Sequence, residues 1–110
     1  MRVNRITVAG LLMEAALGKD VTVLVAHSRE ARVAFDVCVN LAGTSAEKIV
    51  RTNGRESLTM RDGGKIQFAT QHQGRGLKAD VMFLDEGLGR DHELIRDLVR
   101  RNPETEIVRA

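Results

Sequence analysis

Apolar and polar residues follow different periods along this chain, and each period predicts one kind of element. Between residues 5 and 17 apolar side chains occupy most positions, which predicts a helix buried on most of its sides. Residues 21–26 form a short β-branched apolar run, which predicts a buried strand. From Ser28 to Gly43 apolar residues recur every three or four positions, which predicts a second helix with Ser28 as its N-cap.

The middle of the chain changes to a period of two. Residues 57–60 and 65–70 alternate apolar and polar positions around Asp62-Gly63-Gly64, whose glycines suit a tight turn. We therefore expect a β-hairpin over residues 56–70 and a short strand at residues 49–50 before it. A buried strand over 80–85, a helix over 91–101 and a last strand over 106–108 complete the pattern.

A helix between two buried strands is typical of a parallel sheet. The predicted fold is therefore an α/β domain of three layers, with a mainly parallel sheet that also carries a β-hairpin. We expect residues 1–110 to form one domain, because this length suits a single core.

Composition excludes several classes of protein. Hydrophobic residues make up 43% of the chain and charged residues 29%, which is too apolar for a disordered tail. The longest apolar run, residues 21–26, is far shorter than the roughly 20 residues of a membrane span. Cys38 is the only cysteine, so we expect no disulfide framework, no thiolate metal site and a cytoplasmic location. A net charge of +2 permits contact with nucleic acid without indicating it.

The sharpest chemical feature is Asp85-Glu86, which directly follows the apolar run of residues 81–84. This order places both acids at the carboxyl end of a buried parallel strand, the edge where open α/β sheets bind ligands. In a nucleotide hydrolase Asp85 would hold Mg²⁺ and Glu86 would polarise the attacking water. Acids that only end a strand at the solvent boundary explain the pattern equally well.

Three segments in order resemble one family. They read KDVTVLVAHSREA at residues 19–31, DGGKIQF at 62–68 and GRGLKADVMFLDE at 74–86. The set resembles the ATPase domain of phage terminase large subunits, the DNA-packaging motors, and more loosely the helicase-like P-loop ATPases. The resemblance implies a P-loop-type core, a Walker B role for Asp85 and Glu86, and a phage protein in the host cytoplasm.

The chain departs from that family at its start. A P-loop reads G-x-x-x-x-G-K-[ST], so that backbone N–H groups and a lysine hold the phosphates. No glycine precedes Gly10; Arg5 stands roughly where the lysine would be, and Thr7 could replace the hydroxyl. Arg75, between two glycines, is a candidate for contact with phosphate or the DNA backbone. Without the family's first strand a sheet edge is open, which predicts self-association through that edge.

Three hypotheses follow. In the first, the chain is a non-hydrolysing, terminase-like binding module for a protein partner or DNA and needs no cofactor. In the second, it is an ATPase or packaging-motor subunit that binds Mg-ATP once a partner supplies the phosphate loop. The third is a structural domain whose acids merely end a strand. We also predict that Asp85 and Glu86 differ in exposure, and that Arg5 or Arg75 replaces a metal as the counter-charge of the more buried acid.

Overall fold

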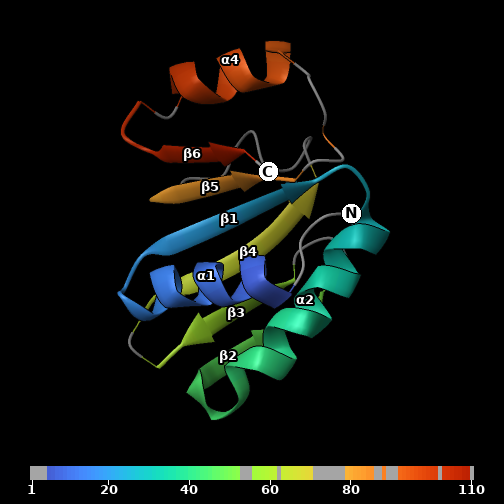
Figure 1. Cartoon of the computed structure of the whole chain (residues 1–110), viewed down its shortest axis with the longest axis vertical. Coiled ribbons are helices and arrows are strands. Elements are labelled where there is room, and N and C mark those ends of the chain that lie inside the picture. The colour runs from blue at the N-terminus through green and yellow to red at the C-terminus, as the bar shows by residue number, and fades with distance from the viewer. Residues whose placement is uncertain are drawn as a thin grey trace.

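A computed structural model describes residues 5–52, 56–61, 63–70, 79–85, 88, 92–101 and 103–109, except for the side chains of residues 5–7, 92, 94 and 109. The chain forms a six-stranded sheet with helices on both of its faces (Figure 1). The elements in chain order are α1 (Arg5–Ala16), β1 (Asp20–Val25), α2 (Ser28–Ala42), the 3-10 turn η1 (Gly43–Ser45), β2 (Ala46–Val50), β3 (Ser57–Met60), β4 (Lys65–Thr70), β5 (Val81–Leu84), α4 (His92–Arg101) and β6 (Glu106–Arg109).

The sheet combines a parallel part with an antiparallel part. Its strand order is β2-β3-β4-β1-β5-β6. β1 lies at the centre and pairs in parallel with β4 on one side and β5 on the other, and β6 pairs in parallel with β5. β2, β3 and β4 pair antiparallel. This arrangement confirms the predicted α/β fold, its mainly parallel sheet and the hairpin. The short strands predicted at residues 49–50 and 106–108 are present and longer, at residues 46–50 and 106–109.

Two hydrophobic clusters lie on opposite faces of the sheet. α1 and α2 cover one face, which Figure 1 shows toward the viewer, and α4 covers the other. The larger cluster joins α1 and α2 to the sheet through residues that include Leu11, Phe35 and Phe68. The smaller cluster, under α4, consists of Leu24, Ala69, Met82, Leu84 and Leu98. Strand alternation separates the two clusters, because neighbouring residues of a strand point to opposite faces.

The prediction that the first helix is buried on most of its sides is wrong. Among the described side chains of α1, from residue 8 onward, the buried ones lie on one side of the helix and are Val8, Leu11, Leu12 and Ala15. These positions share one helical face, and that face packs against β1, β4 and α2. The opposite face is as apolar but lies open, as described below. The sequence could not separate the two faces, because both carry apolar residues.

The second helix begins one residue away from the expected cap. His27, not Ser28, is the N-cap: its extended backbone precedes the helix, and its carbonyl oxygen accepts hydrogen bonds from the N–H groups of Glu30 and Ala31. No side chain caps this end. The helix ends as predicted at Gly43, whose φ of 52° is accessible to glycine at little cost.

The hairpin turn uses its two glycines for different reasons. Gly63 has a φ of 96°, the conformation that the sequence predicted for this turn. Gly64 is buried against α1, and a Cβ added there would lie 1.7 Å from the carbonyl oxygen of Ala15. The second glycine is therefore required for close packing of the hairpin against the end of α1.

Candidate functional site

The carboxyl ends of β1 and β5 form the candidate site. Asp85 follows β5 directly, and its backbone N–H donates to the carbonyl oxygen of Leu24 in β1 at 3.0 Å. The Asp85 carbonyl oxygen in turn accepts from the N–H of Leu88 at 3.0 Å. With only 2% of its surface exposed, Asp85 is one of few buried charged residues in the described part of the chain. It is therefore built into the edge of the sheet rather than left in solvent.

Strand alternation decides which layer Asp85 faces. Val81 and Phe83 belong to the larger cluster and Leu84 to the smaller one, so Asp85 continues the row that faces α1 and α2. Its burial agrees with the prediction that one acid of the pair turns toward a covering layer. Glu86 lies outside the described residues, so the predicted difference in exposure stays a prediction.

The chain changes direction at this point of the sheet. After β1 it continues through α2 toward the β2–β4 side, whereas after β5 it continues through α4 to β6 on the other side. Connections that leave neighbouring parallel strands in opposite directions open a crevice at their carboxyl ends, where ligands of α/β proteins bind. Asp85 directly follows one of these two strands, at the carboxyl edge of the sheet.

Both helices of the front layer begin at the same edge. α2 starts at Ser28, directly after β1. α1 reaches β1 through the three residues 17–19, and its 12 residues span about 18 Å, close to the length of the six-residue strand. The start of α1, with Arg5 and Thr7, is therefore at the carboxyl edge, as Figure 1 shows. Free N–H groups at helix starts attract anions, which gives this edge a favourable field for phosphate.

A pocket of about 470 Å³ opens at the start of α2. The described residues that line it are His27, Ser28, Arg29 and Glu30. The pocket contains the cationic side chain of Arg29, the anionic side chain of Glu30 and the start of α2. Its electrostatic potential is therefore neither uniformly positive nor uniformly negative. His27 is exposed and belongs to no metal-binding group, since no three His, Cys, Asp or Glu side chains of the described part gather for a metal.

The remaining predicted site residues are only partly described. Arg5 and Thr7 lie in the first turn of α1, but their side chains are outside the described part of the chain, and so is Arg75. The structure therefore brings the backbones of Arg5 and Thr7 to the edge that holds Asp85 and leaves their contacts untested. The arginine expected as counter-charge for Asp85 stays a proposal.

One buried acid was missed by the sequence reasoning. Glu56 precedes β3, and its carbonyl oxygen accepts from the N–H of Phe68 at 2.9 Å. Glu56, Leu58 and Met60 alternate with polar residues, so the same period that predicts the strand places Glu56 on its inner face. Glu56 lies three strands away from β5, about 14 Å across the sheet.

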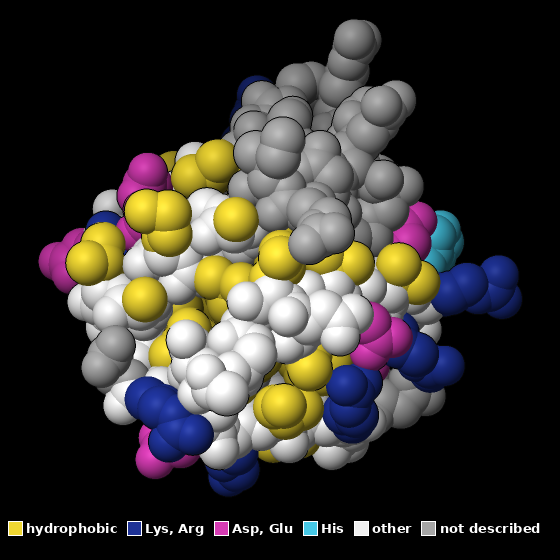
Figure 2. Space-filling view, turned by 60° about the horizontal axis from the view of Figure 1, so that its bottom comes forward, with side chains coloured by type: hydrophobic (Ala, Val, Ile, Leu, Met, Phe, Trp, Pro, Cys, Tyr) yellow, Lys and Arg dark blue, Asp and Glu magenta, His cyan; other side chains and the backbone are white. Residues whose placement is uncertain are grey.

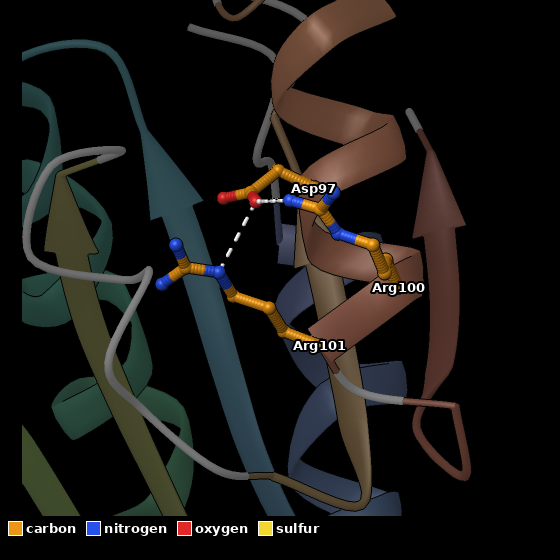
Figure 3. A network of polar contacts seen from close by, with 3 residues as sticks. All are labelled: Asp97, Arg100 and Arg101. Carbon is orange, nitrogen blue, oxygen red and sulfur yellow. Dashed lines mark hydrogen bonds and ion pairs between the residues drawn. The ribbon is translucent and has the colours of Figure 1, made fainter.

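Two further groups carry reactive or charged side chains: Cys38, and the basic side of α4 formed by Arg96, Arg100 and Arg101. Cys38 is fully buried in the larger cluster, and this burial raises the pKa of its thiol to about 12, so it is not a nucleophile at neutral pH. The basic side of α4 is solvent-exposed and partly neutralised by its own helix. Asp97 accepts from Arg100 at 3.0 Å and from Arg101 at 3.1 Å (Figure 3).

No model of a protein family matches this chain, and no curated protein matches it in sequence. Solved structures do match in fold. The large terminase of a thermophilic bacteriophage has a TM-score of 0.68 at 12% identity, covering 99% of this chain and 31% of that one. The same terminase in complex with ADP gives 0.68 at 13% identity, covering 100% and 31%. This chain thus spans about a third of those proteins and has the fold of that third.

The sequence predicted no membrane-spanning segment, and the structure gives one finding on this point. None of the described helices combines the length and the apolar character that crossing a bilayer requires.

Proposed function

We propose that this chain is a terminase-like domain linked to phage DNA packaging, and that by itself it binds a partner without hydrolysing ATP. The observation that carries the proposal is the buried Asp85 at the carboxyl edge of the sheet in a terminase-type fold. A carboxylate at this place is what a Walker B strand presents to a nucleotide-bound metal. The fold and the acid support descent from a nucleotide-handling core.

The absence of hydrolysis rests on the sequence of these 110 residues. They contain no G-x-x-x-x-G-K-[ST] segment, whose N–H groups and lysine hold the β- and γ-phosphates. Without that loop a metal bound by Asp85 would have no held phosphate opposite it. Positioning and charge stabilisation supply most of the catalysis of phosphoryl transfer, so a loosely held nucleotide is not turned over.

The partner of the binding module is a protein or DNA. Protein partners fit the small net charge of +2, because DNA-binding domains usually carry a stronger excess of Lys and Arg. Contact with DNA would depend on basic residues such as Arg75, and its affinity would fall steeply with salt. Fluorescence anisotropy with a labelled duplex at two salt concentrations separates the two partner classes.

A second function is favoured by the two helix starts beside Asp85. α1 and α2 both present their N-terminal ends to this edge, as an anion site requires. In this second candidate the domain is one half of an ATPase, or a packaging-motor subunit, and a phosphate-binding loop from outside these 110 residues completes the site. Asp85 then holds Mg²⁺ and Glu86 orients the attacking water.

Titration with Mg-ATP, followed by calorimetry and phosphate release, tests both candidates. The binding-module function predicts no phosphate release and no Mg-ATP binding that depends on Asp85. With that outside loop supplied, the completed-ATPase function predicts Mg-ATP binding that Asp85→Asn abolishes and that the control Asp80→Asn keeps, because Asp80 is exposed at the opposite end of β5. Phosphate release by the wild-type chain alone, lost in Asp85→Asn, would contradict the first function.

A further inference from the structure

The outer face of α1 is an open apolar surface. It consists of Ala9, Gly10, Met13, Ala16 and Leu17, here called the α1 stripe, and all five residues are exposed. Met13 is 70% and Leu17 76% exposed, the highest values among the large exposed apolar residues. The N–H of Leu17 donates to the carbonyl oxygen of Met13 at 3.2 Å, so Leu17 continues the helical path. Figure 2 shows hydrophobic side chains exposed on this side of the molecule.

Packing of the hydrophobic core does not explain why this surface is apolar, because its five residues are exposed. A surface helix normally carries polar residues on the side away from the core, and one that is apolar all round is normally covered on all sides. Two charged residues close to it in sequence, Glu14 and Lys19, form an ion pair with each other at 2.9 Å, which raises the pKa of Lys19. The stripe is therefore continuous and uncharged, with the ion pair beside it.

Gly10 adds an independent observation. It lies inside a helix, where glycine is less favourable than alanine by about 0.5–1 kcal/mol. A Cβ added at Gly10 would meet nothing within 4 Å, so packing within the chain does not require glycine there. A second helix lying directly across Gly10 would require it, because small residues let two helices approach closely.

The spacing of the stripe fits a copy of itself. Its positions are symmetric about Met13, with Ala9 and Gly10 four and three residues before it and Ala16 and Leu17 three and four residues after it. In an antiparallel pair with its twofold axis at Met13, Leu17 of each copy lies opposite the small Ala9 of the other. Large residues thus meet small ones, and residue 13 meets its own symmetry mate.

We propose that a second copy of this chain covers the α1 stripe, through antiparallel, twofold pairing of α1 with α1. This inference goes beyond the proposed function and does not depend on it. Twofold pairs bury the same surface on both partners, and that surface must be complementary to itself. A contact along one three-turn helix is near the lower limit for specific interfaces, about 1,000 Å² in total. We therefore expect a reversible equilibrium between monomer and dimer.

Light scattering and sedimentation of the 110-residue chain over a wide range of concentration test the proposal. The mass should rise from the 12.1 kDa of the monomer toward twice that value. Leu17→Glu should keep the monomer mass throughout, because it places two carboxylates in the interface. Val99→Glu is the matched control, because Val99 is an exposed apolar residue of α4 on the other face of the sheet, and it should dimerise as the wild type does.

Two variants test the geometry of the pair. Met13→Cys should give a covalent dimer with a short bismaleimide crosslinker, and Val99→Cys should not. Cys38 contributes no background, because it is buried. Gly10→Leu should weaken dimerisation at least tenfold while the fold persists by circular dichroism, since a Cβ added at this position meets no atom within 4 Å.

Three results would overturn the proposal. One is a wild-type chain that stays monomeric at the highest concentration measured. Another is a dimer that Leu17→Glu leaves intact, since association through the β6 edge would survive this substitution. A Met13→Cys variant that dimerises but does not crosslink would exclude the twofold axis at residue 13.

Discussion

The two faces of the sheet are covered by helices of different character. α4 buries Leu98 and exposes Arg96, Arg100 and Arg101, so its outer face is polar. α1 buries Leu11 and its neighbours but exposes Met13 and Leu17 as well. Because α4 has a polar side and α1 has none, the sequence of α4 shows which of its sides is buried and the sequence of α1 does not. The comparison shows that the apolar residues of a helix identify its buried side only when the opposite side of the helix is polar.

The two faces also differ in how much they stabilise the fold. The larger cluster joins two helices and holds Phe35 against Phe68, with ring centres 6.0 Å apart in an edge-to-face arrangement. The smaller cluster attaches α4 alone, through Leu98 and the partly buried Ile95. Substitutions in the larger cluster should therefore lower the free energy of unfolding more.

The largest effect is expected from Phe35→Ala. The side chain is fully buried between α2 and the sheet, and its removal also loses the contact with the Phe68 ring. The free energy of unfolding should fall by about 3–5 kcal/mol in urea titrations. Phe35→Leu, which keeps most of the volume, should lose less than half as much. Equal losses in the two variants would show that packing volume is not what the ring supplies.

A smaller loss is expected from Leu98→Ala, about 2–4 kcal/mol, because this residue fixes α4 to the sheet. Hydrogen exchange should speed up in α4 and β6 before it does so in α1 and α2, since the two clusters are separated by the sheet. Val99→Ala is the control and should change little, because Val99 is exposed. Uniform acceleration across the chain would show that the two faces unfold together.

The smallest effect is expected from Asp97→Asn. Asp97 accepts from two arginines of the same helix, whose side chains are 77% and 54% exposed, and exposed ion pairs contribute little. We expect a loss below about 1 kcal/mol that shrinks further in 1 M salt. A loss that salt leaves unchanged would mean that Asp97 acts through its burial rather than through its charge.

Most of the fold could be predicted from the sequence because its periods are clear. A β-branched run predicted β1, a short apolar run predicted β5, alternation predicted β3 and β4, and the glycines at 43 and 63 marked an end and a turn. The exposure of α1 could not be predicted, since apolar residues surround it. The need for glycine at position 64 could not be predicted either, because it comes from a contact with Ala15, 49 residues away in sequence.

The site could be predicted only in part. The position of Asp85 at the end of a parallel strand follows from the apolar run before it, and the structure confirms that it lies there, buried. The burial of Glu56 was missed, although alternation with Leu58 and Met60 indicated it. A counter-charge for Asp85 depends on contacts between distant segments, which no local pattern specifies.

The account's central proposal is that an arginine takes the place of a metal beside the buried Asp85. The most direct test is the free energy of unfolding of Asp85→Asn in metal-free buffer, compared with Asp20→Asn, an exposed acid at the start of β1. The account predicts a loss of about 1–3 kcal/mol for Asp85→Asn and almost none for the control. Unchanged or increased stability of Asp85→Asn would contradict it.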